Sequence, residues 1–294
     1  MKIKQTPDQK LFNVAASLIV GGFGLASLIP FIVLIVGSIS SENSIIRFGY
    51  SLFPREFSIE AYKRIFSDPG VILHAYGITI AITVLGTILS LFVSAMAAYV
   101  LFRKEVKYRN KLSFFLYFTT LFNGGLASFY IVINNYYDLK DKFIVLLLVP
   151  MFHVVHILIL RSFMKGSLHD SLIESARMDG AGEFNIFATI ALPLSKPALA
   201  TIGLFTALGY WNDWWTPMLF VENRDLFPLQ YVLYRVLATS EIGSAIVNTS
   251  IAIEMPKETL KLALTVISTG PIVLAYPFAQ KYFVRGIMIG AVKG

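Results

Sequence analysis

Residues 69–102 read PGVILHAYGITIAITVLGTILSLFVSAMAAYVLF, a stretch of 34 residues without a single acidic residue, lysine or arginine. A helix needs about 20 mostly apolar residues to cross the hydrocarbon core of a bilayer. This stretch exceeds that length and lies between two charged residues, Asp68 and Arg103. It therefore predicts a transmembrane helix.

The same pattern repeats along the rest of the chain. Three further charge-free runs are 31, 26 and 18 residues long. Two more apolar runs lie in the C-terminal third, and the first of them is interrupted only by Asp213. We expect an all-α integral membrane protein with six transmembrane helices, at residues 12–38, 72–101, 113–136, 143–160, 198–221 and 262–281.

Composition supports this expectation. Hydrophobic residues make up 56% of the chain and charged residues 15%, whereas soluble domains have roughly 45–50% and about 25%. These values exclude a soluble enzyme and a nucleic-acid-binding module, so we attribute the net charge of +7 to basic loops that set orientation. The chain has no cysteine, which excludes a disulfide framework and a thiolate metal site.

The distribution of lysine and arginine predicts the orientation. The side that holds both termini carries 15 of these residues and the other side 10, and five of them lie in the short loop 102–111. Basic loops face the cytoplasm. We therefore expect both termini and the 161–196 loop to be cytoplasmic, with segments 42–68 and 222–260 outside.

The 161–196 loop contains a short amphipathic pattern. Leu168, Leu172 and Ala176 recur four residues apart and predict an apolar stripe on a slim helix. Gly180 and Gly182 predict the end of that helix, because glycine tolerates the dihedral angles found there. Such a helix either docks into a groove on another protein or lies on the membrane surface.

A motif in this loop resembles a known family. Glu174-Ser-Ala is followed by three residues, Gly180, nine residues and then Ile190-Ala-Leu-Pro193. This spacing resembles the EAA loop of binding-protein-dependent ABC importer permeases, with Ser175 where alanine is common. The resemblance implies the type I permease fold over residues 1–294, with a coupling helix in loop 167–193 that contacts an ATPase subunit. The residues implied in ATPase coupling are Glu174, Ser175, Ala176, Asp179, Gly180, Leu192 and Pro193.

Further stretches are similar to the carbohydrate branch of this family, and to its subgroup for larger oligosaccharides, including uronate chains such as alginate fragments. They are Phe122-Asn-Gly-Gly-Leu126, Gly209-Tyr-Trp-Asn212, Pro228-Leu-Gln230 and residues 276–290. The resemblance implies a multi-pass subunit of the bacterial inner membrane, without catalytic activity or a cofactor of its own. The implied partners are a homologous second permease, an extracytoplasmic solute-binding protein and two ATPase subunits that bind ATP and Mg²⁺. The tail 285–294 is implied as a second ATPase contact.

Residues 209–215 are the most informative intramembrane stretch, because they contain all three tryptophans of the chain. Aromatic faces stack on sugar rings, and amide or carboxylate groups bond sugar hydroxyls. Tryptophan also gathers at membrane interfaces, so an aromatic belt remains an alternative. Our candidates for the substrate pathway are Tyr210, Trp211, Asn212, Asp213, Trp215, Asn123 and Gly124.

Two further intramembrane features leave alternatives open. A carboxylate inside a span is costly, so we expect Asp213 to contact substrate or to pair with a basic residue of the second permease. His153 and His156, three residues apart, favour helix-packing hydrogen bonds over a metal site, because no carboxylate accompanies them. An importer for an amino acid or a polyamine, and a membrane-embedded enzyme using this histidine pair, remain rival functions.

Overall fold

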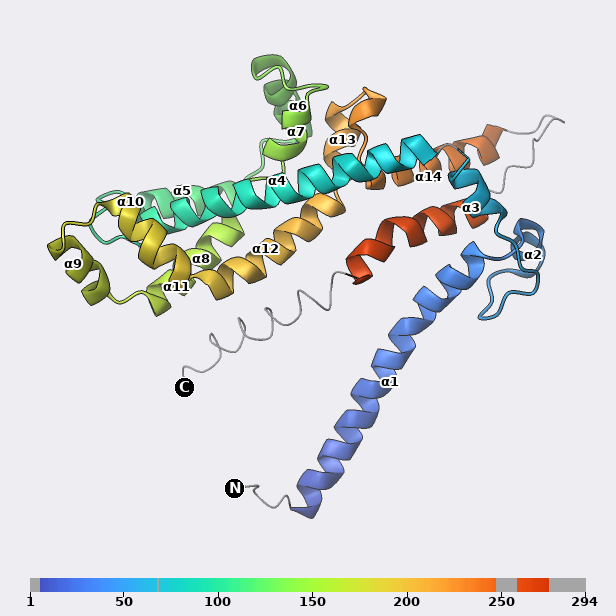
Figure 1. The fold of residues 1–294 in the computed structure, drawn as a ribbon, viewed down its shortest axis with the longest axis horizontal. Coiled ribbons are helices and arrows are strands. Elements are labelled where there is room, and N and C mark those ends of the chain that lie inside the picture. The colour runs from blue at the N-terminus through green and yellow to red at the C-terminus, as the bar shows by residue number, and fades with distance from the viewer. Residues whose placement is uncertain (1–5, 68, 247–257, 275–294) are drawn as a thin grey trace. The chain divides into compact units, whose positions relative to one another are not determined.

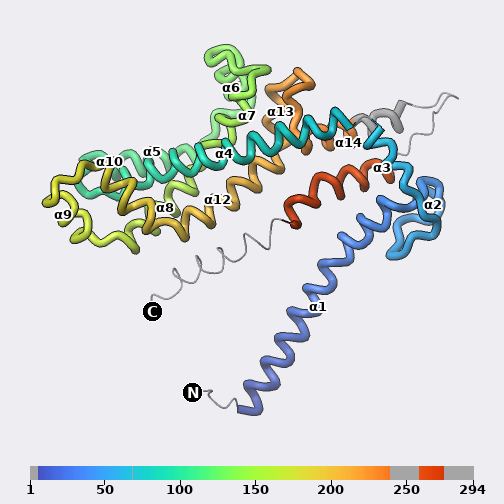
Figure 2. Tube along the Cα trace, viewed as in Figure 1, coloured from blue at the N-terminus to red at the C-terminus, as the bar shows by residue number. Residues whose placement is uncertain are grey.

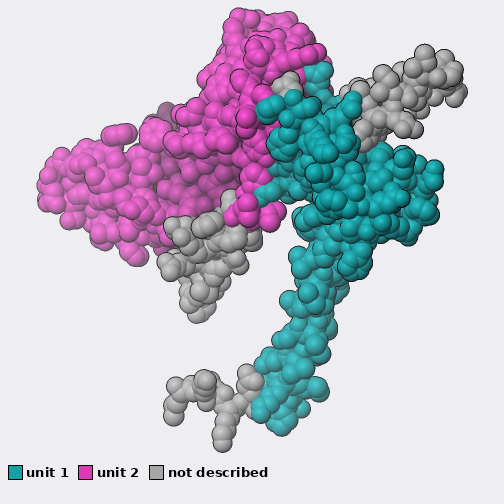
Figure 3. Space-filling model, turned by 45° about the vertical axis from the view of Figure 1, so that its right-hand side comes forward, with its two compact units in different colours: residues 1–69, 235–270 teal, residues 70–234, 271–294 magenta. Residues whose placement is uncertain are grey.

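The structure is a computed structural model of the chain and describes residues 6–67, 69–246 and 258–274. Figures 1 and 2 follow the chain through a series of helices. Within the described ranges no strand is formed, and the one extended pairing is an isolated bridge between Ser40 and Phe57. Two compact units are distinguished in Figure 3: residues 1–69 with 235–270, and residues 70–234 with 271–294.

The first unit contains α1 (Pro7–Ser38), α2 (Glu42–Phe48), α3 (Glu60–Ile65) and residues 258–270 of a helix that spans 258–274. The start of α1 is fixed by a capping box, in which the Thr6 hydroxyl and the Gln9 side chain each accept the other's backbone N–H. The Glu42 carboxylate accepts the N–H groups of Glu258 and Thr259, both at 2.9 Å. These bonds satisfy two backbone donors at the start of the 258–274 helix.

The second unit begins with the long helix α4 (Pro69–Phe102) and carries all the candidate site residues. Its remaining elements are short, and several end at breaks within predicted spans. They are α5 (Arg109–Leu121), α6 (Leu126–Ile131), the π-helix η1 (Val132–Tyr136), α7 (Phe143–Leu148), α8 (Val154–Ser167), α9 (Asp170–Met178), α10 (Glu183–Ile186), the π-helix η2 (Phe187–Ala191), α11 (Leu192–Leu194), α12 (Lys196–Trp211), α13 (Trp215–Phe220), the 3-10 helix η3 (Arg224–Leu226) and α14 (Leu229–Ile246), which continues into the first unit.

Helices α4 and α12 approach each other closely at Gly86 and Tyr210. The Tyr210 ring lies so near Gly86 that a Cβ there would stand 2.3 Å from it. The same ring is 1% exposed, and its hydroxyl donates to the Leu147 carbonyl at 2.6 Å. Small residues that let helices approach closely are characteristic of packing inside membranes. Tyr210 therefore ties α4, α12 and the end of α7 together.

The expected spans agree with the structure only in part. Among the described residues, α1 and α4 are long and apolar enough to cross a membrane, and bent pairs raise the number of candidate spans to four at most. The α5 and α6–η1 helices meet at 115°, and residues 183–194 meet α12 at 79°. Residues 113–136, 143–160 and 198–221 are thus not single helices. The predicted residues 275–281, the similarity at 276–290 and the tail 285–294 lie outside the described residues.

Local chemistry explains these breaks. Gly125, between α5 and α6, has φ +85°, a conformation that other residues rarely adopt. Pro150 lies in the non-helical segment that separates α7 from α8. Residues 212–214 separate α12 from α13. A hydropathy count includes such residues in a span, although their backbone leaves the helix.

Candidate functional site

Helix α9 is the short helix that the loop motif predicts, and Gly180 terminates it. Gly180 has φ +81°, its N–H donates to the Arg177 carbonyl at 2.9 Å, and the Ala181 N–H donates to the Ala176 carbonyl at 2.9 Å. This pair of bonds is a Schellman motif, which favours glycine at its left-handed position. The sequence prediction of a helix end at Gly180 is confirmed.

The apolar stripe on α9 differs from the predicted one. Leu168 precedes the helix and caps the end of α8 instead, and Leu172 is exposed. The buried residue of α9 is Ile173, at 3% exposure, with Ala176 half-buried one turn later. Leu168 is nevertheless buried in the same apolar cluster as Ile173, and Ala176 packs against it, so the predicted stripe is wrong only at Leu172. Glu174, Ser175 and Asp179 are exposed, and Met178 beside them is 88% exposed.

The rest of the loop returns the chain to the membrane helices. Ile186 and Phe187 are buried in an apolar cluster that also contains Tyr99 and Leu101 of α4. Ile190 and Leu192 pack against this cluster. Leu192 and Pro193 form the short helix α11, and α12 follows after Ser195. Pro193 thus lies close to the bend into α12, as its position in the motif predicts.

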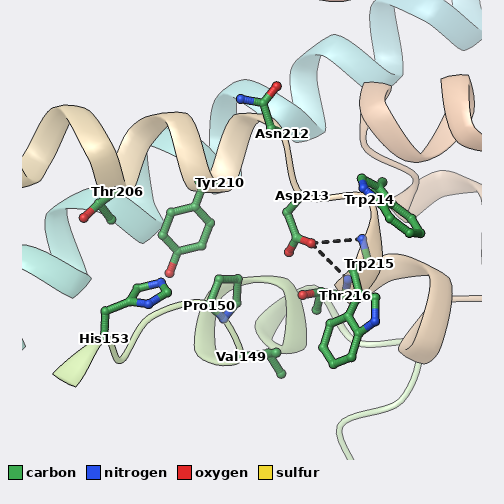
Figure 4. Close-up of a pocket in the computed structure, with 11 residues that line it drawn as sticks. Val149, Pro150, His153, Thr206, Tyr210, Asn212, Asp213, Trp214, Trp215 and Thr216 are labelled. Atoms are coloured by element: carbon green, nitrogen blue, oxygen red, sulfur yellow. Dashed lines mark hydrogen bonds between the residues drawn. The ribbon is translucent and has the colours of Figure 1, made fainter. Parts of the chain in front are cut away.

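A pocket of about 360 Å³ lies at the break between α12 and α13 (Figure 4). The non-helical segment before α8 forms part of its wall, so two interrupted helices meet there. Interrupted helices of this kind are where membrane transporters place substrate sites. The lining residues are Val149, Pro150, His153, Thr206, Gly209, Tyr210, Asn212, Asp213, Trp214, Trp215 and Thr216.

The carboxylate of Asp213 caps helix α13. Its Oδ1 accepts the backbone N–H groups of Trp215 at 3.1 Å and Thr216 at 3.0 Å, as the dashed lines in Figure 4 show. This bonding satisfies donors that the helix break would otherwise leave unpaired. The sequence suggested only substrate contact or pairing with another subunit, and it missed this local role.

The capping role gives a direct prediction. Asp213→Asn should preserve stability, because an amide oxygen accepts the same two N–H groups, whereas Asp213→Ala should cost about 0.5–2 kcal/mol. Thermal unfolding of the purified protein in detergent measures the difference. Equal destabilisation by both substitutions would show instead that the negative charge itself is required.

The aromatic side chains of this region divide into two groups. Trp214 and Trp215 line the pocket; Trp214 stacks on Tyr234 with ring centroids 4.6 Å apart, and Trp215 stacks on Phe129 at 6.2 Å. Trp211 is not among the lining residues, and its ring lies 6.4 Å from Tyr76. Trp215 therefore offers an aromatic wall to the pocket, whereas Trp211 packs against α4.

The remaining predicted pathway residues lie in different surroundings. Asn212 lines the pocket and accepts a hydrogen bond from Gln230 at 3.2 Å. Asn123 and Gly124 lie in the break between α5 and α6, where the Asn123 side chain accepts the Gly125 N–H at 2.8 Å. Neither Asn123 nor Gly124 lines the pocket, so the structure does not bring them together with the α12–α13 residues.

The pocket also contains side chains that the sequence did not single out for it. His153 is exposed and lines the pocket, while His156 contacts Thr206 with 3.4 Å between Nδ1 and Oγ1. The contact of His156 agrees with the predicted role in helix packing. His153 could not be assigned to the pocket from the sequence, because the prediction placed it inside a continuous helix.

Comparison with known proteins identifies the family. The profile described as "Binding-protein-dependent transport system inner membrane component" matches residues 91–289. The chain is similar to Protein LplC of Bacillus subtilis (strain 168), with 38% identity over 98% of this chain and 97% of the relative. It is also similar to the polygalacturonan/rhamnogalacturonan transport system permease protein YtcP of the same organism, with 35% identity over 92% and 94%.

A solved structure is similar over nearly the whole length. It is described as a bacterial ABC transporter involved in the import of the acidic polysaccharide alginate, and its matching chain is 28% identical with a TM-score of 0.80. The match covers 96% of this chain and 100% of the other. The chain therefore belongs to the family of inner membrane components of binding-protein-dependent transport systems, the permease subunits of ABC importers, which are not enzymes themselves.

Proposed function

We propose that this chain is one of two permease subunits of an importer that carries oligosaccharides across the bacterial inner membrane. The observation that supports this most is its end-to-end similarity to a permease named for polygalacturonan and rhamnogalacturonan and to a chain of the alginate importer. ATP hydrolysis, with Mg²⁺, takes place in two partner ATPase subunits. A solute-binding protein delivers the substrate from outside.

We further propose that the substrate contains uronic acid units. The carbohydrates named for the two relatives include acidic polymers, and the pocket offers groups suited to such a chain. The Trp214 and Trp215 rings provide apolar faces for sugar rings. The exposed His153 imidazole lines the same pocket and donates hydrogen bonds to hydroxyl or carboxylate oxygens. The single carboxylate there, Asp213, already receives two backbone N–H groups, which offset its repulsion of an anion.

In this proposal, α9 couples ATP hydrolysis in the partner subunit to movement of the substrate pathway. Glu174, Ser175 and Asp179 lie exposed on or next to a rigidly terminated helix, and the Met178 side chain projects beside them. An exposed short helix with a mixed apolar and acidic surface suits a groove on a partner protein. We assign that groove to an ATPase subunit.

The membrane topology completes the proposal. The proposed topology has six spans: the four candidate spans of the described residues, with each broken pair counted as one, and the expected spans 143–160 and 262–281. It places both termini and α9 in the cytoplasm. Segments 42–68 and 222–260 then face the solute-binding protein. A second, homologous permease completes the pathway, because one chain supplies only half of the walls in a pathway formed between two subunits.

Uptake by cells tests the substrate assignment. Cells that express the two permeases, the ATPase and the binding protein are supplied with labelled neutral oligosaccharides, uronate-containing oligosaccharides, amino acids and polyamines. We expect accumulation of uronate-containing chains, abolished when this permease is deleted. Accumulation of neutral oligosaccharides alone would refute the uronate assignment. Accumulation of an amino acid or polyamine without any sugar would refute the oligosaccharide assignment.

A further inference from the structure

Four charged side chains join the end of α4 to the segments on either side of Gly180, and we call them the ion cluster: Arg103, Glu105, Arg177 and Glu183. Arg177 donates to Glu183 Oε1 from Nη2 at 2.6 Å and from Nε at 3.1 Å, and to Glu105 Oε1 at 2.9 Å. Arg103 donates to the same two oxygens at 3.0 Å and 3.3 Å. Each arginine thus contacts both carboxylates.

The cluster is anchored to α4 by burial. The Arg103 side chain is only 5% exposed, and the Tyr99 hydroxyl donates to Glu183 Oε2 at 3.0 Å. Partial burial raises the pKa of Glu183, but hydrogen bonds from Arg177 and Tyr99 and the charge of Arg103 outweigh this and hold it below its ordinary value. Exposed ion pairs contribute little, whereas a buried charge depends strongly on its partners. Arg103 therefore makes this cluster more than a surface contact.

A second contact holds the other end of α9. Lys104, next to Arg103, forms an ion pair with Asp170, the first residue of α9. Between the two ends of α9, the Ile173 side chain is 3% exposed and belongs to the same apolar cluster as Tyr99 and Leu101 of α4. Helix α9 is therefore attached to residues 99–105 at its beginning, its middle and its end.

These contacts provide a second path by which movement of α9 can reach other helices, besides the polypeptide chain itself. Along the chain, α9 reaches α12 through the Gly180 turn, α10, η2 and α11. Across space, α9 and Glu183 reach α4 through the ion cluster and the Lys104–Asp170 pair. Because α12 carries part of the pocket and α4 packs on the Tyr210 ring, both routes lead to the same region.

We propose that Arg103 and Arg177 are positioning residues of energy coupling, which fasten α9 and α10 to the cytoplasmic end of α4 so that the three move as one body. This inference rests on the proposed docking of α9 on an ATPase. It gives part of the basic loop 102–111 a mechanical role in addition to its role in topology. The ion cluster and the Lys104–Asp170 pair stay formed throughout the transport cycle, so movement of α9 displaces α4 directly.

Cross-linking tests whether α9 stays attached to the end of α4 during the transport cycle. The chain has no cysteine, so Lys104→Cys and Asp170→Cys introduce the only two thiols of this subunit. In the complete complex, made with cysteine-free partners, a short cleavable bis-thiosulfonate reagent links them in place of the ion pair. We expect the linked complex to retain the ATP hydrolysis that the loaded binding protein stimulates. Loss of stimulation on linking, with recovery after cleavage by a reductant, would overturn the proposal.

Substitution tests whether the cluster transmits coupling. Couplings between sites typically amount to factors of roughly 5–150, so Arg177→Gln should lower stimulated ATP hydrolysis by about tenfold. Basal hydrolysis and co-purification of the ATPase should be unchanged, and Arg177→Lys, which keeps the charge, should recover part of the stimulation. Lys107→Gln is the matched control, because Lys107 lies in the same loop and contacts only the Tyr108 ring among the interactions described.

The outcomes distinguish this inference from the proposed function. Normal stimulation of Arg177→Gln, or an equal loss of stimulation and ATPase co-purification, would refute the positioning role. An unmodified complex that no loaded binding protein stimulates would contradict the proposed function itself. The identity of the sugar affects neither comparison, because stimulated and basal hydrolysis are compared within the same complex.

Discussion

Replacing Gly180 with proline is expected to abolish the ATP hydrolysis that a loaded binding protein stimulates. Gly180 has φ +81°, whereas the proline ring fixes φ near −65°. Proline also removes the N–H that donates to the Arg177 carbonyl at 2.9 Å. The Schellman motif cannot form, so α9 loses its defined end and the adjacent residues Glu174, Ser175 and Asp179 lose their fixed positions. This loss follows from the proposed docking of α9 on an ATPase subunit.

The measurement is ATP hydrolysis by the complete complex in the presence and absence of the loaded binding protein. Gly182→Ala is the matched control, because Gly182 has φ −72° and an added Cβ meets nothing within 4 Å. Gly180→Asn should keep most of the activity, since asparagine tolerates the left-handed conformation. Full stimulation of Gly180→Pro would contradict the assignment of this loop to coupling.

The second large effect is expected at Gly86, where α4 and α12 meet. A Cβ at this position would lie 2.3–2.7 Å from atoms of the Tyr210 ring. That ring cannot move easily, because it is buried and its hydroxyl is bonded to the Leu147 carbonyl. Overpacking a tight contact typically costs about 1–3 kcal/mol. Gly86→Ala should therefore lower the unfolding temperature of the purified protein.

Gly77 offers the control on the same helix. An added Cβ at Gly77 meets nothing within 4 Å, so Gly77→Ala should be neutral or should stabilise α4 by up to about 1 kcal/mol. Combining Gly86→Ala with Tyr210→Leu removes the ring that causes the clash. Recovery of stability in the double variant relative to Tyr210→Leu alone supports a direct contact, and purely additive losses would exclude it.

Long-range patterns in the sequence predicted the parts of this fold that depend on composition. The charge-free runs led to α1 and α4, because a helix in lipid needs only length and apolar side chains. The spacing from Glu174 to Pro193 predicted the family. Gly180 predicted the end of α9, because glycine is favoured where φ is positive. The leucine spacing placed Leu168 and Ala176 correctly against the apolar cluster but not Leu172, because Ile173 is buried in its place and that depends on how α9 packs.

The breaks within spans could not be derived from hydropathy. Asp213 counted as an isolated charge inside an apolar run, and its capping bonds depend on where α12 stops. His153 and Thr206 meet in one pocket although they lie 53 positions apart in the chain. Arg103 counted as one basic residue of an orientation signal, while its contact with Glu183 depends on packing between distant segments. Tertiary contacts decide each of these cases.

The interrupted helices also dictate where lipid cannot reach. Every peptide group at residues 122–125, 149–153 and 212–214 that leaves the helical pattern has to find another hydrogen-bond partner. Hydrocarbon chains provide none, and each orphaned group in the bilayer core costs several kcal/mol. These three segments must therefore face protein or water. The uninterrupted helix α4 satisfies its backbone groups within itself and can face lipid along its length.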